Sequence, residues 1–269
     1  MPNENEQFWN GIISEYFKKN PDTTSGKYTP PVNGFTPDAA NGRQILNILF
    51  VVDVSGSMKG TRIASVNYAL ENLIKEMRDR QDMNSTIKIG IMEFADYATW
   101  RTATPIPLED YYWTSIEAQP WFTNYGVAFL ELEKKLHKNA FMNPDMGEYF
   151  APLILFISDG EPVDVEEYPK ALEKLQANKW FQKSGRYAIA VGEEAKSPEV
   201  IETLAQFTGD QANVRYVDEG AELCDLIQFI TVRASEVQTS MVVSDGAGTN
   251  SIFKDRDDAL FSSLYKKKK

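Results

Sequence analysis

A buried strand that ends in a cluster of oxygen-bearing side chains constrains this chain more than any other feature. The apolar run Ile45–Val52 predicts a strand covered on both faces, and Asp53, Ser55 and Ser57 follow it directly. Open α/β sheets bind their ligands at loops beyond the carboxyl ends of such strands. Alternate residues of an extended segment point the same way, so the three oxygens point toward one position. One carboxylate with two hydroxyls is a hard oxygen set that suits Mg²⁺, Mn²⁺ or Ca²⁺ and not zinc.

Two later segments offer oxygens of the same kind. Thr123 stands just before a predicted helix over residues 125–138, and Asp159 ends the apolar run of residues 153–158. Taken singly, Thr123 could be a helix N-cap, and either aspartate could cap a helix or complete a turn. Taken together, the three segments predict one metal site whose candidate ligands are Asp53, Ser55, Ser57, Thr123 and Asp159.

Strands and helices alternate along the body of the chain. Strands are predicted at residues 45–52, 87–94, 153–158, 187–191 and 214–217, with a short returning edge strand at 98–102. Amphipathic helices are predicted at 61–80, 125–138, 165–180, 198–207 and 221–233. This alternation indicates an α/β fold, a doubly wound, Rossmann-like sheet of about six mostly parallel strands with one short antiparallel edge strand and helices on both faces.

Composition shifts set the expected boundaries. Residues 1–42 form an N-terminal extension in which a short helix, with apolar positions from Phe8 to Phe17, precedes an irregular Pro- and Gly-rich leader. Residues 43–235 form the domain, and residues 236–269 form a flexible polar tail that ends in four lysines. We therefore expect one domain with two extensions.

The charge balance limits the partners. The formal net charge is −11, which argues against nucleic acid and against anionic lipid surfaces, because both attract basic proteins. No apolar run approaches the roughly 20 residues of a membrane span, and the polar start does not resemble a secretory signal. We therefore expect no membrane partner and a cytoplasmic location. The sequence does not indicate an oligomeric state.

The motifs carry a family resemblance. The string Val52–Met58 followed by Gly60, together with Ile157–Pro162, resembles the von Willebrand factor type A (VWA) domain with a metal-ion-dependent adhesion site, over about residues 43–235. The resemblance implies that the five candidate residues hold a divalent cation, Mg²⁺ or alternatively Mn²⁺ or Ca²⁺. It implies one open position that an Asp or Glu side chain of a partner protein completes, in a non-enzymatic interaction module. Among subfamilies the chain looks most like bacterial VWA proteins of the tellurium-resistance type, which are linked to stress or phosphorylation signalling.

The segment that leads to Thr123 departs from the family pattern. Many relatives have glycines just before the threonine, whereas this chain has Trp121 and Phe122. Other aromatic residues precede or follow them in this region. Two interpretations stay open for the group: cover for the sheet edge, or an aromatic rim where a partner binds. Its members are Tyr111, Tyr112, Trp113, Trp121, Phe122 and Tyr125.

Enzymatic alternatives find less support in the sequence. A Mg²⁺-dependent phosphohydrolase or phosphotransferase using Asp53 as nucleophile is the main alternative, but the haloacid dehalogenase pattern has a second aspartate where this chain has Ser55. A P-loop motif is absent. Serine hydrolysis lacks a base, because the only histidine, His137, lies in a charged helix end.

Overall fold

The computed structural model describes residues 44–79, 85–218, 222–227 and 230–231. The short helix expected near residues 8–17 and the tail from residue 236 lie outside these ranges. In the described part of the chain no helix is long and apolar enough to cross a bilayer.

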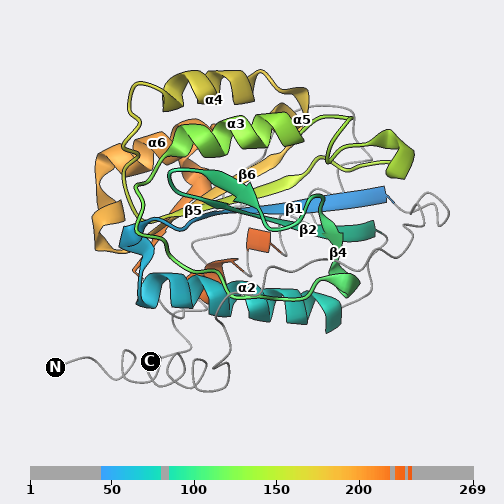
Figure 1. The fold of residues 1–269 in the computed structure, drawn as a ribbon, viewed down its shortest axis with the longest axis horizontal. Helices are drawn as coiled ribbons and strands as arrows, with labels where there is room; N and C mark the ends of the chain where they lie inside the picture. The colour runs from blue at the N-terminus through green and yellow to red at the C-terminus, as the bar shows by residue number, and fades with distance from the viewer. Residues whose placement is uncertain (1–43, 80–84, 219–221, 228–229, 232–269) are drawn as a thin grey trace.

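One sheet organises the described residues (Figure 1). Its order is β3-β2-β1-β5-β6-β7, and β4 also pairs with β2. The pairs β1–β2, β1–β5, β5–β6 and β6–β7 are parallel, whereas β3 and β4 run antiparallel to β2. The strands are β1 Gln44–Asp53, β2 Ser85–Phe94, β3 Ala98–Trp100, β4 Ile106–Pro107, β5 Leu153–Ser158, β6 Gly185–Val191 and β7 Val214–Val217. The predicted α/β fold with a mostly parallel sheet is confirmed. Strand β4 was not predicted, because it is two residues long and contains a proline that cannot donate to a ladder.

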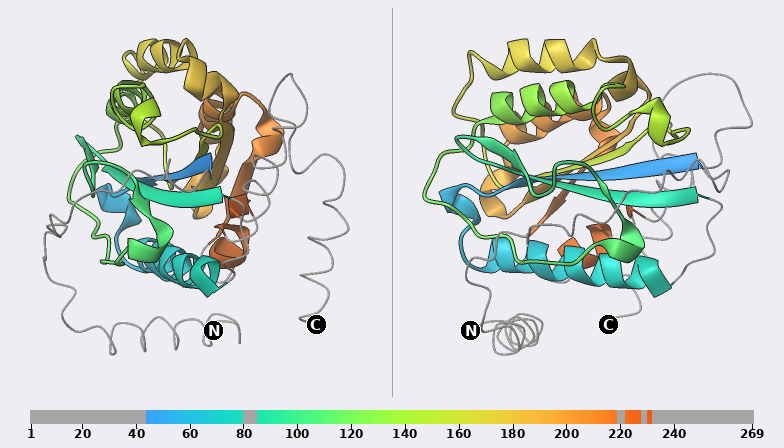
Figure 2. Two further views of the ribbon diagram at one scale, coloured as in Figure 1. Left: turned by 90° about the vertical axis from the view of Figure 1, so that its right-hand side faces the viewer. Right: turned by 45° about the vertical axis from the view of Figure 1, so that its right-hand side comes forward.

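Helices cover both faces of the sheet (Figures 1 and 2). Helix α2 lies on one face, together with the helical residues 222–227 and 230–231, whereas α3, α4 and α6 lie on the other. The helices are α2 Thr61–Asp79, α3 Tyr125–Lys135, α4 Tyr168–Gln176, α5 Lys179–Lys183 and α6 Pro198–Thr208. Short 3₁₀ turns join them: η2 Gly56–Met58, η3 Leu108–Asp110, η4 Pro144–Met146, η5 Glu193–Lys196 and η6 Gln211–Asn213.

Strand β1 shows why this arrangement is stable. Its alternate side chains enter two cores: Phe50 and Val52 pack with the α2 side, and Leu49 and Val51 pack with the α3 side. Every residue of β1 after Gln44 is buried. A strand apolar on both faces is stable only between two helical layers, as its sequence predicts.

One predicted helix is divided in two. The apolar spacing predicts a continuous helix over residues 165–180, but α4 begins at Tyr168 and ends at Gln176, and α5 starts at Lys179. Asn178 separates them, because its side chain accepts hydrogen bonds from the amides of Trp180 and Phe181 and so caps α5. The apolar period continues through the break, so periodicity alone could not reveal it.

The strand order places the polar strand ends side by side. Strand β1 lies between β2 and β5, and the helices that follow β1 and β5 cover opposite faces of the sheet. Such a reversal of direction opens a crevice at the carboxyl ends of the two central strands, where open α/β sheets bind ligands. Asp53 ends β1 and Asp159 directly follows β5.

Candidate metal site

The carboxyl ends of β1 and β5 bring the two predicted aspartate segments together. Val52 pairs with Ile157 in the parallel ladder, so Asp53 lies beside Ser158. The Ser158 hydroxyl donates to Asp53 Oδ2 at 2.6 Å, and the Ser55 amide donates to Asp53 Oδ1 at 2.8 Å. Both carboxylate oxygens of Asp53 are therefore held in place.

Ser57 links the β1 loop to the β5 loop. Its hydroxyl lies 3.0 Å from Ser55 Oγ and donates to Asp159 Oδ1 at 2.8 Å. A continuous series of contacts therefore runs from Asp53 through the two serines to Asp159. Two carboxylates and two hydroxyls from segments about a hundred residues apart meet at one edge of the sheet.

Thr123 reaches the same region through its backbone. Its carbonyl accepts from the Val163 amide at 2.8 Å, and the Gly56 amide donates to the Trp121 carbonyl at 3.0 Å. The Thr123 segment therefore lies between the two aspartate loops. The N-cap of α3 is Asn124, whose side chain accepts from the Val127 amide. The alternative capping role for Thr123 is therefore wrong.

Burial gives the site its electrostatic character. Asp53 is completely buried, and this burial raises its pKa to about 7 despite hydrogen bonds from Ser158 and Ser55, with the charge of Asp159 adding to the rise. Among the described residues, no group of three or more His, Cys, Asp and Glu side chains is arranged so that it could hold a metal ion. The donor set here is hydroxyl and carboxylate oxygen alone, so the residues fit a hard divalent cation.

Arg62 lies at this site and was missed by the sequence analysis. From the first turn of α2 its guanidinium donates to Asp159 Oδ2 at 2.7 Å and forms an ion pair with Glu194 of η5. Gly192 makes room for it: this residue has φ +89°, and a Cβ there would lie 2.6 Å from Arg62 Nε. One fixed positive charge therefore faces the second site carboxylate.

Asp164 was also missed. Its buried carboxylate accepts from the Tyr125 amide at 3.0 Å and the Gly126 amide at 2.7 Å, at the start of α3. Gly126 permits this approach, because a Cβ there would lie 2.5 Å from Asp164 Oδ2. Burial raises the pKa of Asp164, although the two amide hydrogen bonds oppose the rise. Its partners lie nearly 40 positions earlier in the chain, so no local sequence signal reveals the role.

The aromatic group divides into buried members, which cover the core, and exposed members. Tyr111 and Tyr125 are buried, and Trp113 packs against the core. The Tyr125 hydroxyl donates to the Gly160 carbonyl at 2.9 Å, under the Asp159 loop. Trp121 and Phe122, in contrast, are exposed beside Thr123, whereas Tyr112 is exposed away from it, just after η3.

Comparison with known proteins agrees with this architecture. The family model for the von Willebrand factor type A domain matches residues 47–229. The chain belongs to the von Willebrand factor type A family. It is 27% identical over 183 residues to mouse (Mus musculus) inter-alpha-trypsin inhibitor heavy chain H3, a match that covers 66% of this chain and 20% of that protein.

Solved VWA structures share the fold at low identity. One is mussel byssus proximal thread matrix protein 1 with zinc in its metal-ion-dependent adhesion site (MIDAS) motif. Its TM-score is 0.52, with 16% identity over 72% of this chain and 48% of that one. Another is a von Willebrand factor type A protein from Catenulispora acidiphila, with TM-score 0.52 and 13% identity over 72% of this chain and 43% of that one. The chain spans less than half the length of each of these relatives.

Proposed function

We propose that this VWA domain is a divalent-cation-dependent protein-interaction module. Asp53, Ser55, Ser57, Thr123 and Asp159 would hold the cation, and an Asp or Glu side chain of a partner protein would complete its coordination. Mg²⁺ is the expected metal, with Mn²⁺ and Ca²⁺ as alternatives. The bound cation supplies a positive charge that attracts the partner carboxylate.

The observation that carries the proposal is the Ser57 bridge. Its hydroxyl joins Ser55 and Asp159, so oxygens from two strand ends already converge before any ligand is considered. The site contains only two carboxylates, and Arg62 partly neutralises one of them. A divalent cation bound there keeps a net attraction for a further carboxylate.

The geometry favours this function over the alternative phosphohydrolase. Asp53 has no exposed surface, and both its oxygens accept hydrogen bonds from the protein. A phosphohydrolase of this kind also needs a general acid, and the haloacid dehalogenase pattern places an aspartate for it two positions after the nucleophile, where this chain has Ser55. Hydrolysis of p-nitrophenyl phosphate in Mg²⁺ that depends on Asp53 would support the alternative instead.

Calorimetric titration of metal-free protein with Mg²⁺, Mn²⁺ and Zn²⁺, each followed by glutamate, tests the proposal. Zn²⁺ is included because zinc occupies the site of the mussel relative, whereas the ligand type in this chain favours harder cations. We expect Mg²⁺ or Mn²⁺ to bind at one site, and glutamate to bind only to the metal-loaded protein.

Two variants complete that experiment. Ser57→Ala removes the exposed bridging hydroxyl and is expected to weaken metal binding about tenfold or more. Asp110→Asn, an exposed acid on η3, should leave metal affinity unchanged. Metal binding that both variants leave intact, or that glutamate never follows, would contradict the proposal.

The cellular role is proposed on the family resemblance alone. A cytoplasmic protein of the tellurium-resistance type, acting in bacterial stress or phosphorylation signalling, remains the expectation. A Mg²⁺-dependent pull-down compared with EDTA, followed by identification of the captured proteins, tests it. Capture of a kinase or phosphatase would support this role, and capture of unrelated proteins alone would contradict it.

A further inference from the structure

An exposed apolar surface surrounds the candidate metal site. Most large hydrophobic side chains that are exposed in the described part of the chain belong to the loops that carry Thr123 and Asp159, or contact those loops. We call this set the apolar surface, and it consists of Tyr97, Trp121, Phe122, Val163 and Val165.

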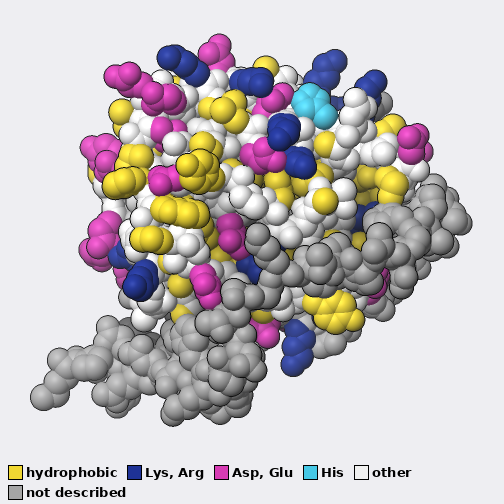
Figure 3. Space-filling view, viewed as in Figure 1, with side chains coloured by type: hydrophobic (Ala, Val, Ile, Leu, Met, Phe, Trp, Pro, Cys, Tyr) yellow, Lys and Arg dark blue, Asp and Glu magenta, His cyan; other side chains and the backbone are white. Residues whose placement is uncertain are grey.

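Contacts bring four of these residues together, and Val165 follows Val163 on the same loop. Phe122 directly precedes Thr123, whose carbonyl accepts from the Val163 amide. The Phe122 amide in turn donates to Asp96 Oδ1 at 3.1 Å, which ties the Thr123 segment to the β2–β3 turn. The rings of Tyr97 and Trp121 meet edge to face, 6.0 Å between centroids. In the space-filling view of Figure 3, hydrophobic side chains gather toward the end of the molecule where β1 terminates, with acidic side chains around them.

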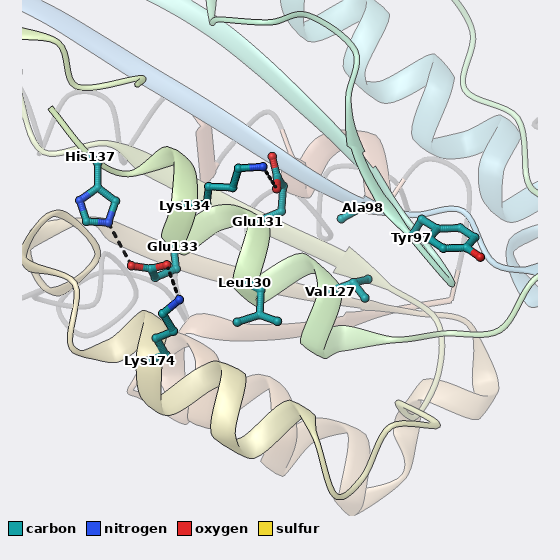
Figure 4. A pocket seen from close by; sticks show the side chains of 9 residues that line it. All are labelled: Tyr97, Ala98, Val127, Leu130, Glu131, Glu133, Lys134, His137 and Lys174. Atoms are coloured by element: carbon teal, nitrogen blue, oxygen red, sulfur yellow. Dashed lines mark hydrogen bonds and ion pairs between the residues drawn. The ribbon is translucent and has the colours of Figure 1, made fainter. Parts of the chain in front are cut away.

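The surface continues along α3. Tyr97 also lines an open groove of about 700 Å³ with Val127 and Leu130 (Figure 4). The opposite end of the groove is polar, and there Glu133 pairs with both His137 and Lys174. Since α3 begins next to Thr123, the apolar end of the groove is the one nearer the metal site.

Acidic side chains outnumber basic ones around the site, although Arg62 pairs with Asp159 and Glu194, and Lys59 is exposed just after Ser57. Glu161, Glu166 and Glu167 are exposed on the loop that carries Val163 and Val165, and Glu194 is exposed on η5. A segment with several carboxylates would be repelled there, whereas a lysine or arginine would be attracted. Charge complementarity therefore favours a segment with one carboxylate and a basic neighbour.

We infer that the partner of this VWA domain presents an extended segment in which one carboxylate is flanked by a large apolar side chain on one side and a basic side chain on the other. The inference rests on the proposed metal-dependent function and adds the chemistry of its partner. Phe122 lies one residue from Thr123, and an extended chain advances about 3.3 Å per residue. The apolar side chain therefore lies within about two residues of the carboxylate and packs on Phe122 and Tyr97.

Blocked tripeptides titrated into ¹⁵N-labelled full-length protein in saturating Mg²⁺ test the inference. The probes are acetyl-Gly-Glu-Gly-amide, acetyl-Phe-Glu-Gly-amide and acetyl-Gly-Glu-Phe-amide. We expect one phenylalanine peptide to bind about tenfold more tightly than the glycine peptide, because apolar surface is removed from water only there. Replacing its remaining glycine by lysine should tighten binding further, and replacing it by glutamate should weaken binding.

Matched variants separate the apolar contact from an effect on the metal. Phe122→Ser should bring the phenylalanine peptides to within about twofold of the glycine peptide and leave glycine-peptide and Mg²⁺ affinity unchanged. Tyr112→Ser is the control: Tyr112 is 71% exposed and Phe122 is 70% exposed, but Tyr112 follows η3, which packs near the far end of α2. This control should change no affinity. Both positions are exposed, so both variants should fold.

Each other outcome has a defined meaning. Equal affinity for all tripeptides overturns the inference while the proposed function stands, whereas no binding of any tripeptide to metal-loaded protein overturns both. A Phe122→Ser loss shared equally by the glycine peptide also overturns the inference. Sedimentation that shows a dimer lost in Phe122→Ser would assign the apolar surface to a second copy of this chain and overturn it.

Discussion

At the scale of single residues, the site joins what the motif predicts to what only the fold reveals. The motif names Asp53, Ser55, Ser57 and Asp159, and the structure brings these residues into contact. Ser158 belongs to the matched string Ile157–Pro162, but its bond to Asp53 was not predicted, and neither was the bond of Arg62 to Asp159, because each joins positions about a hundred apart. Residues that follow one strand can be recognised as a group from their spacing in the sequence. Contacts between the ends of different strands depend on the strand order, which the spacing does not give.

Asp53 gives the metal-free protein a characteristic pH dependence. Burial raises its pKa from 3.8 to about 7, so the folded protein binds more protons than the unfolded chain between these values. Its contribution to the free energy of unfolding therefore falls as pH rises through this window, by at most about 1.4 kcal/mol per pH unit, and becomes constant above pH 7 or so.

We predict that Asp53→Asn in EDTA removes this fall and makes the variant more stable than the wild type at pH 8. Urea unfolding at pH 5 to 8 measures it. In excess Mg²⁺ the wild-type trend should reverse, because the metal binds the ionised carboxylate. Parallel pH profiles for wild type and variant in EDTA would contradict the assignment.

Arg62 should oppose metal binding while it holds the Asp159 loop. Its guanidinium is hydrogen-bonded to Asp159, the second carboxylate of the candidate metal site, and a positive charge there repels a cation. We predict that Arg62→Gln tightens Mg²⁺ binding about fivefold at low salt, less at high salt, by calorimetry. Arg78→Gln is the matched control, because Arg78 lies at the other end of α2 and bonds only to the Leu108 carbonyl among the described contacts. Equal effects of the two variants would show a general charge effect instead.

At the scale of elements, periodicity predicted where helices and strands form better than where they end. The apolar positions of α2 and the buried run of β1 were sufficient to predict both elements. The break between α4 and α5 could not be predicted in this way, because Leu172 and Leu175 before it and Phe181 after it all pack in the same core. The hydrogen bonds that Asn178 accepts from the Trp180 and Phe181 amides decide the break. A single Asn in the sequence does not reveal this role, because Asn also occurs within helices on their exposed side.

The start of α3 is the element most directly coupled to the site. Asp164 accepts from two amides there, and Thr123 lies just before them. We predict that Asp164→Ala lowers the free energy of unfolding by about 2 kcal/mol, since it removes a helix cap and leaves buried amides unpaired. It should also weaken Mg²⁺ binding about fivefold or more, because the start of α3, directly after Thr123, loses two of the hydrogen bonds that hold it against the loop after Asp159.

Asn178→Ala provides the comparison for that variant. Asn178 is also buried and accepts from two helix amides, but its contacts lie at the far end of α3. It should lower stability by a similar amount, measured by urea unfolding, and leave Mg²⁺ affinity unchanged. If Asp164→Ala also leaves Mg²⁺ affinity unchanged, Asp164 is a cap and no more.

At the scale of the whole molecule, the strand order turns separate motifs into one site. Alternating strands and helices predicted a doubly wound sheet, but they did not give the order in which β1 lies between β2 and β5. That order depends on contacts among elements distant in sequence. The sequence showed that aromatic residues cluster near Thr123, but it did not show which of them are exposed. The burial of Tyr125 and the exposure of Phe122 follow from packing and not from residue type.

The proposed domain boundaries make a whole-molecule prediction. A fragment of residues 43–235 should unfold cooperatively and bind Mg²⁺ with an affinity within about twofold of the full chain, by calorimetry. The reason is that every candidate ligand and both hydrophobic cores lie inside it. An insoluble fragment, or one with much weaker binding, would place part of the structural unit in residues 1–42 or 236–269.

Crystals grown with Mn²⁺ offer the most direct test of the central claim, through anomalous diffraction at the manganese edge. We expect one strong peak within coordination distance, about 2–2.5 Å, of Ser55 Oγ and Ser57 Oγ, with the Thr123 and aspartate oxygens around it. A carboxylate added to the crystals should then contribute an oxygen to that ion. A peak on other residues, such as the exposed Glu193 and Glu194, with none at the ends of β1 and β5, would contradict it.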